Sequence, residues 1–187
     1  MPAGTPNKFT KIARRFLVPQ FVVTLYYLAK ARTMVSHRAE VELSPLLTFG
    51  RGCVVGSFTK IKATEGEVII GAQSGIATSC FIGGGDGGIH IGDHFICGPN
   101  VNIIASNYVI EDATVPVEQQ GSVSKGIRIG SNVWVGAGCT ILDGAVIGDN
   151  TVVVANSLVN RRYPPNSIVQ GSPAKVIMRR KVGDNEE

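Results

Sequence analysis

The stretch "GIRIGSNVWVGAGCTILDGAVIGDNTVVVANSLVN", residues 126–160, repeats with a period of six. An aliphatic residue returns at every sixth position, and two positions before it stands a small or β-branched residue. The recurring aliphatic residues are Ile129, Val135, Ile141, Ile147, Val153 and Val159. This period matches neither a helix, at about 3.6 residues, nor a single strand, at about 2.0. It is typical of short parallel strands joined by similar corners, three of which close a triangular coil of about 18 residues.

The same frame continues upstream, with irregular joins between its blocks. Ile61 and Ile70 are nine positions apart, as are Ile82 and Ile91, so each join holds a three-residue insertion. The upstream inward positions are Leu43, Phe49, Val55, Ile61, Ile70, Ile76, Ile82, Ile91, Cys97 and Ile103. The sequence therefore predicts an all-β stack of coils.

Composition agrees with a single domain built on tight turns. The chain has 187 residues, 44% of them hydrophobic, which is enough for a sizeable core. Only 17% are charged and 23 are glycine, as expected where many corners need a residue without a Cβ. The cysteines show no paired or metal-ligand spacing, and the frame places them in the core: Cys53, Cys80, Cys97 and Cys139. With no evident signal peptide, we expect a reducing, cytoplasmic location.

The basic residues are unevenly distributed. Residues 1–39 hold seven Lys and Arg side chains and no Asp or Glu, within a chain of net charge +4. Residues 9–35 are expected to form one or two short helices, broken or begun at Pro19. This segment either caps the first coil or makes a peripheral contact with an anionic membrane, at its inner face, and the two readings are compatible. No nucleic-acid-binding motif is present.

Residues 126–177, ending in "NRRYPPNSIVQGSPAKVI", resemble the hexapeptide-repeat acyltransferases. The similarity is strongest to the sugar O-acetyltransferase branch, which includes maltose, galactoside and polysaccharide acetyltransferases, and it covers residues 43–178. It implies a left-handed parallel β-helix and a homotrimer with acetyl-CoA in the clefts between subunits, without a metal. The implied reaction is direct transfer of an acetyl group to a hydroxyl group of a sugar or glycan. We therefore divide the chain into a cap segment at 1–40, an acyltransferase domain at 41–178 and a tail at 179–187.

The resemblance also assigns residues that would bind the cofactor. A tryptophan would form a wall at the acyl end of the cleft, two alanines would let the pantetheine arm approach the backbone, and three polar residues would meet the nucleotide end. In that order they are Trp134, Ala137 and Ala155, Asn160, Arg161 and Lys175. The alternatives are a tryptophan that is merely buried by a neighbouring subunit and basic residues that only keep the surface soluble.

The segment "SNYVIEDATVPVEQQG", residues 106–121, interrupts the repeat and is expected to lie in an extruded loop spanning 105–126. Tyr108 stands where the resembling enzymes carry their catalytic histidine. A tyrosine hydroxyl, with an ordinary pKa of about 10, is a poor general base at neutral pH. Because His90 precedes Tyr108 by 18 positions, we expect the two to stack on successive coils. His90 is then the candidate base and Tyr108 the group that orients the acceptor, with Glu111 and Asp112 as weaker alternatives.

Two function classes fit the sequence. The chain fits an acetyltransferase, or a catalytically weakened trimer that binds CoA or an acceptor. A zinc carbonic anhydrase built on the same fold is disfavoured, because His37, His90 and His94 have the wrong arrangement. A sugar nucleotidyltransferase would need a further nucleotide-binding domain. The glycine run "GGGDGG", residues 83–88, is expected to be a turn and not a phosphate loop, since repeat sequence follows it instead of a helix.

Overall fold

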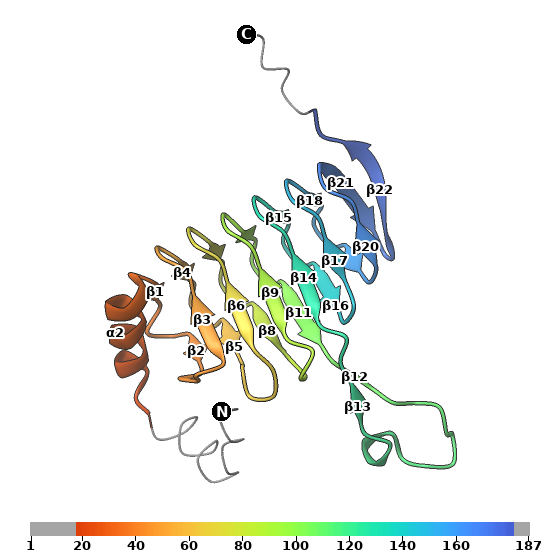
Figure 1. The fold of residues 1–187 in the computed structure, drawn as a ribbon, viewed down its shortest axis with the longest axis horizontal. Helices are drawn as coiled ribbons and strands as arrows, with labels where there is room; N and C mark the ends of the chain where they lie inside the picture. The colour runs from red at the N-terminus through yellow and green to blue at the C-terminus, as the bar shows by residue number, and fades with distance from the viewer. Residues whose placement is uncertain (1–17, 182–187) are drawn as a thin grey trace, which may run out of the picture.

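Three sheets run the length of the computed structural model, which describes residues 18–181 (Figure 1). We call them sheets A, B and C, in the order in which each coil visits them. Sheet A contains β1 (Met34–Val35), β4 (Val54–Val55), β7 (Gly75–Ile76), β10 (Ile96–Cys97), β15 (Trp134–Val135), β18 (Val152–Val153), β21 (Ser167–Gly171) and β22 (Ala174–Arg179). Sheet B contains β2 (Glu40–Val41), β5 (Lys60–Ile61), β8 (Phe81–Gly84), β11 (Asn102–Ala105), β16 (Thr140–Leu142) and β19 (Leu158–Val159). Sheet C contains β3 (Leu47–Phe49), β6 (Val68–Ile70), β9 (Ile89–Ile91), β14 (Ile127–Ile129), β17 (Val146–Ile147) and β20 (Arg162–Tyr163).

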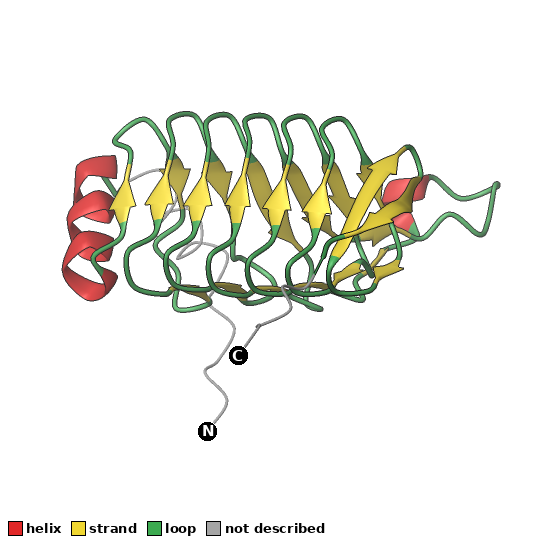
Figure 2. Cartoon of the chain, turned by 90° about the horizontal axis from the view of Figure 1, so that it is seen from above, coloured by secondary structure: helices red, strands yellow, loops and turns green. Residues whose placement is uncertain are grey.

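The strand register follows the six-residue frame. Val135 pairs in parallel with Val153, 18 positions later, and both are buried. Ile61 pairs with Ile82, 21 positions later, because one three-residue insertion lengthens that coil. Strands of one sheet are parallel except for β22, which returns antiparallel to β21. The stack of coils and its insertions are therefore confirmed, and Figure 2 shows the coils side by side.

The frame is wrong at its first position. Val41, not Leu43, pairs with Ile61 and is buried in the core. Leu43 is only half-buried and leads into a turn, which the Ser44 hydroxyl stabilises by donating a hydrogen bond to the Ala63 carbonyl oxygen at 2.8 Å. The turn takes up the extra residues of the first coil, so the inward position falls two residues earlier.

All four cysteines are free and buried, as predicted. The sulfur atoms of Cys80 and Cys97 lie 3.9 Å apart inside the stack. Burial raises the pKa of the Cys53 and Cys139 thiols, which keeps them protonated and unreactive. The four cysteines are therefore residues of the hydrophobic core.

Helix α2 (Gln20–Ala31) stands across the open end of the first coil (Figure 2). Its start directly after Pro19 agrees with the prediction, whereas the predicted helical region at residues 9–17 lies outside the described residues. The helix ends at Arg32, which adopts a left-handed φ of 51°. Beyond it the prediction of helix to residue 35 is wrong, because Met34–Val35 pair with β4 as the first strand of sheet A. The stack thus begins at residue 34, inside the segment assigned to the cap. Among residues 18–181, no helix is long and apolar enough to cross a membrane.

Between β11 and β14 the chain leaves the three sheets. β12 (Asn107–Tyr108) pairs antiparallel with β13 (Ser122–Val123), and a 3₁₀ turn spans Val117–Gln119. Figure 1 shows this hairpin projecting from the side of the stack. Inside its loop the Gln120 side-chain amide donates hydrogen bonds to the carbonyl oxygens of Asp112 and Val115, both at 2.8 Å.

Tyr27 is the main contact between α2 and the coils, and its loss should be costly. Its ring is buried and makes a T-shaped contact with Phe49 at a centroid distance of 5.0 Å, and its hydroxyl donates to the Glu42 carbonyl oxygen at 3.0 Å. Tyr27→Ala should lower the free energy of unfolding by about 3–5 kcal/mol. Tyr26→Ala, which removes a half-exposed ring next to it, should cost about 1 kcal/mol. Urea unfolding curves measure both, and equal losses would contradict this role for Tyr27.

Candidate functional site

Trp134 begins β15 and points out of sheet A. Its neighbour Val135 is fully buried, so the alternation of the strand leaves the indole outside, where 56% of Trp134 is exposed. In the described chain this large aromatic surface is open to solvent. It provides a flat apolar wall on the outside of sheet A.

Ala137 lies on the corner that follows Trp134, and Ala155 lies on the equivalent corner of the next coil, after β18. The amide of Asn156 donates to the Ala137 carbonyl oxygen at 2.9 Å, which stacks the two corners on successive coils. A Cβ on Gly136 would stand 2.5 Å from the Ala155 nitrogen, so the backbones there pack too closely for a side chain. The two corners that follow the strands of Trp134 and Val152 therefore pack backbone against backbone, with only methyl side chains at Ala137 and Ala155.

The three predicted polar residues are exposed but lie in two places. Lys175 is on β22, opposite Gln170 of β21, at the C-terminal end of sheet A. Asn160 and Arg161 follow β19 and lie at the corner between sheets B and C. Lys175 therefore shares a sheet with Trp134, whereas Asn160 and Arg161 lie across the width of sheet B.

His90 points out of sheet C and contacts a carboxylate. Its Nε2 lies 2.5 Å from Oε1 of Glu67, and both side chains are partly exposed. When the imidazole is neutral and Nε2–H donates to this carboxylate, the lone pair is on Nδ1. The pair therefore resembles a base held in one tautomer by an acidic partner.

The predicted stacking of His90 on Tyr108 is wrong. His90 pairs with Ile69 on one side and with Arg128 on the other, whereas Tyr108 lies in the hairpin opposite Ser122. The prediction assumed that the 18 residues from His90 to Tyr108 form one complete coil of the stack. It leaves after β11, and the next strand of sheet C is β14, so the residue that follows His90 in the column comes 38 positions later.

The base of the hairpin is nevertheless attached close to His90. The Ser124 hydroxyl donates to the Ala105 carbonyl oxygen at 2.5 Å and accepts from the Gly87 amide at 3.0 Å. Gly87 belongs to the glycine run, whose first two residues end β8 and whose residues 85–88 form a turn closed by a 3.2 Å hydrogen bond from the Gly88 amide to the Gly85 carbonyl oxygen. The expectation of a turn is confirmed for residues 85–88 and wrong for Gly83 and Gly84, which are in β8. Ser124 thus fixes the hairpin to the turn that precedes His90.

An open groove of about 550 Å³ lies along sheet C. His90 and Arg128 line one end, and Asp149 and Pro165 line the other. Sequence reasoning missed Glu67 and Arg128. The pattern that places His90 outward, between two buried isoleucines, recurs at Arg128 in "IRI" and was the available signal for Arg128.

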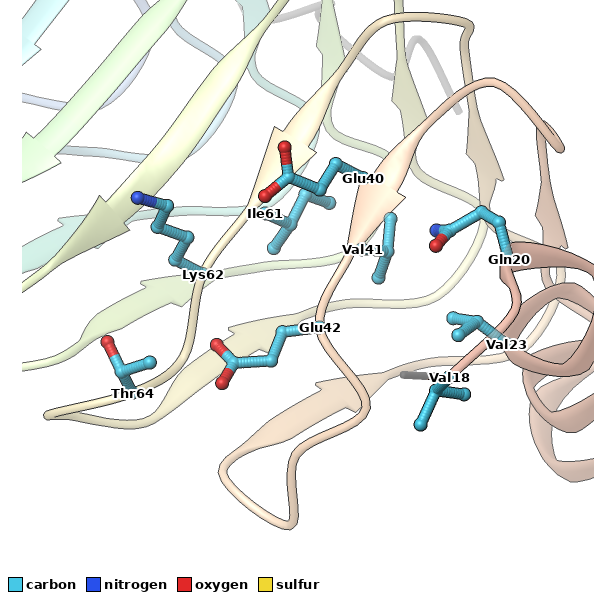
Figure 3. A pocket seen from close by; sticks show the side chains of 9 residues that line it. All are labelled: Val18, Gln20, Val23, Glu40, Val41, Glu42, Ile61, Lys62 and Thr64. Carbon is cyan, nitrogen blue, oxygen red and sulfur yellow. The ribbon is translucent and has the colours of Figure 1, made fainter. Parts of the chain in front are cut away.

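A second cavity, between the start of α2 and sheet B, is too small for a substrate. Figure 3 shows Gln20 pointing into it from the helix, opposite Val41 and Glu42 of the first coil. Its volume is about 30 Å³, enough for bound water but not for a sugar or CoA. Among the described residues, Gln20 Nε2 is a buried polar atom without a hydrogen-bond partner. One bound water would satisfy it, so this cavity is a structural feature.

The outer face of sheet A carries an apolar column along the stack. The outward residue of each strand pairs with the next, giving Met34, Val54, Gly75, Ile96, Trp134, Val152 and Ile168 in register. About half of Met34 and Ile96 is exposed, at 58% and 55%. A Cβ on Gly75 would meet no atom within 4 Å, so the column has a hollow between Val54 and Ile96. A row of exposed apolar side chains with a hollow in it is a feature of contact surfaces.

The predicted cofactor and base residues lie on different faces of one chain. Trp134 projects from sheet A, and His90 projects from sheet C. Among residues 18–181, no three His, Cys, Asp or Glu side chains gather as metal ligands would. Within one chain, Trp134 and His90 therefore point outward from different faces.

Comparison with known proteins points to one family. The family described as bacterial transferase hexapeptide (six repeats) matches residues 126–161. The galactoside O-acetyltransferase of Escherichia coli (strain K12) is 34% identical over 100 residues, 53% of this chain and 47% of that protein. The chain spans about half to three fifths of the length of the first curated relatives that it matches.

Solved structures share the fold. A maltose O-acetyltransferase from Clostridium difficile 630 superposes with a TM-score of 0.59 and 26% identity, covering 94% of this chain and 84% of that one. AntD, an N-acyltransferase from Bacillus cereus solved in complex with dTDP and 3-hydroxybutyryl-CoA, superposes with a TM-score of 0.71 and 23% identity. The superposition covers 80% of this chain and 81% of the AntD chain.

Proposed function

The chain belongs to the hexapeptide-repeat transferase family, and from this premise we propose that it is an acetyl-CoA-dependent O-acetyltransferase acting on a sugar or glycan hydroxyl. The observation that carries the proposal is the surface formed by Trp134, Ala137 and Ala155 within the matched repeats. An exposed indole beside close-packed backbone suits the pantetheine arm of CoA. We further propose the left-handed coil of the resembling enzymes.

The rest of the donor site follows from the exposed polar residues. Lys175 at the end of sheet A is proposed to meet a phosphate of CoA, as a charged ammonium group does well. Asn160 and Arg161 are proposed to contact the nucleotide end, from the corner after β19. Sheet B separates these two residues from Trp134. We therefore infer that they contact CoA bound in the cleft at the far edge of sheet B.

We propose a homotrimer whose interfaces use the apolar column of sheet A. A cyclic trimer places one face of each chain against a different face of the next. That arrangement brings Trp134 of one chain toward His90 of its neighbour, which a single chain cannot do. The site is then complete only in the assembly.

The proposed chemistry needs no covalent intermediate on the protein. Nδ1 of His90 accepts the proton of the acceptor hydroxyl while Glu67 holds Nε2–H, and the hydroxyl oxygen attacks the thioester carbon of acetyl-CoA. The C–S bond then breaks, the acetyl group stays on the sugar oxygen, and the CoA sulfur takes the proton from the imidazolium. The Tyr108 hydroxyl, on the hairpin attached beside His90, orients the acceptor.

A weakened, CoA-binding trimer is the second candidate, and the tyrosine at position 108 favours it. Incubating the protein with radiolabelled acetyl-CoA and a panel of sugars and nucleotide sugars separates the two functions. The enzyme should release CoA with at least one acceptor and transfer the labelled acetyl group to it. Tight binding of CoA, with no free CoA formed from acetyl-CoA in the presence of any acceptor, would support the second candidate.

Lys175→Ala should weaken binding of CoA more than binding of dephospho-CoA. A charge-assisted contact is worth about 1.5–3 kcal/mol, so the dissociation constant for CoA should rise by roughly 10- to 150-fold. Binding of dephospho-CoA, which lacks the 3′-phosphate, should change little. Calorimetric titration of both ligands measures the difference, with Lys181→Ala as a matched basic control on the C-terminal side of β22. Equal losses for both ligands would place Lys175 away from that phosphate.

A further inference from the structure

Helix α2 carries an apolar stripe on the face that points away from the coils. Phe21, Leu25 and Leu28 recur at the spacing of one helix face and are 61%, 59% and 44% exposed. The opposite face holds Val23 and Tyr27, which are buried against the first coil. The helix thus has two apolar sides, and the coils account for only one of them.

Basic side chains surround the C-terminal end of this helix. Lys30 and Arg32 are exposed there, and Arg51 joins them because the amide of Gly52 donates to the Ala31 carbonyl oxygen at 3.1 Å. Between residues 18 and 39 the sequence holds Lys30, Arg32 and Arg38 and no Asp or Glu. The first acidic side chain, Glu40, pairs with Lys60 at 2.6 Å on sheet B. The end of the molecule that α2 closes is therefore both apolar and positively charged.

We propose that the outer face of α2 docks on an anionic lipid bilayer. An apolar stripe and a basic cluster are the two signals that peripheral binding requires, and neither alone gives stable attachment. A second copy of the chain is the weaker occupant, because pairing the same face of two chains would bring Lys30, Arg32 and Arg51 of one against the same three residues of the other. Phe21, Leu25 and Leu28 enter the interface between headgroups and acyl chains, while Lys30, Arg32 and Arg51 meet the phosphates.

Flotation of the full-length protein with vesicles tests this docking. Phosphatidylcholine vesicles with about 30% phosphatidylserine should bind it on the order of ten-fold better than pure phosphatidylcholine, and added salt should weaken the difference. The variant Phe21→Asn/Leu25→Asn/Leu28→Asn should lose on the order of ten-fold in binding to the anionic vesicles. Its three sites are exposed, so its thermal unfolding should match that of the unchanged protein.

A matched variant changes three exposed apolar residues of the hairpin, Ile110→Asn/Val117→Asn/Val123→Asn, and should bind vesicles like the unchanged protein. Equal binding to both vesicle types, or unchanged binding by the α2 variant, would overturn the proposal. So would assembly beyond a trimer in the absence of lipid that the α2 variant abolishes, since the occupant would then be a second copy.

Discussion

His90→Ala should lower kcat for acetyl transfer by about 10²- to 10⁴-fold, the usual contribution of a general base. The expectation rests on the contact between His90 and Glu67, which leaves one ring nitrogen able to accept a proton. The KM for acetyl-CoA should change little, because His90 is proposed to take the proton of the acceptor hydroxyl and not to hold CoA. Steady-state kinetics on the acceptor found in the panel measure both parameters.

Glu67→Gln should cost less than loss of the imidazole. A glutamine oxygen still accepts from Nε2–H, but without the charge that stabilises the imidazolium. We therefore expect kcat to fall by about ten-fold, with the KM for acetyl-CoA unchanged. His94→Asn is the matched histidine control. His94 has a left-handed φ of 55°, and asparagine holds equivalent corners at Asn132 and Asn150, so the exchange should leave both folding and turnover intact.

Tyr108→His distinguishes the enzyme from its weakened alternative. If His90 is the base, a histidine at position 108 should change turnover by only a few-fold. Unchanged turnover in His90→Ala together with a large gain in Tyr108→His would show that His90 plays no part. The protein would then be an enzyme that lost its histidine at the hairpin.

The stack of coils was predictable because each six-residue repeat contains its own inward-pointing residue. The burial of an aliphatic residue such as Val135 or Ile141 can be predicted without knowing which distant residues it contacts, since successive coils repeat the same environment. The three-residue insertions were predictable for the same reason, because each one lengthens the fixed six-residue spacing between inward residues. Counting failed only where residues left the stack, at Leu43 in its turn and at Tyr108 in the hairpin.

The grouping of site residues could not be counted in this way. Glu67 reaches His90 because the two strands β6 and β9 are neighbours across a coil whose length depends on an insertion. Arg128 replaces Tyr108 in the column because the chain returns to sheet C only at β14. Local pattern thus predicts which side chains point outward. Their neighbours depend on the path between coils.

Ile96→Asp should convert the proposed trimer into monomers at micromolar concentration and reduce acetyl transfer to the detection limit. Ile96 lies in the apolar column between the hollow at Gly75 and the indole of Trp134. A carboxylate there stays hydrated in a monomer but must be buried without a partner in the assembly, at a cost of several kcal/mol for each interface. About 1.4 kcal/mol changes an association constant tenfold, so three such interfaces should not survive.

Sedimentation velocity and circular dichroism, run together, separate dissociation from unfolding. The Ile96→Asp monomer should keep its β signal, because Ile96 is 55% exposed and its replacement removes nothing from the core. Phe21→Asp, which changes an exposed apolar residue on α2 instead, should remain trimeric and active. Because the proposed site joins Trp134 of one chain to His90 of its neighbour, loss of the proposed trimer should also remove activity. A monomeric variant that still transfers acetyl groups would place the whole reaction within one chain, and a trimeric one would place the interface on another face.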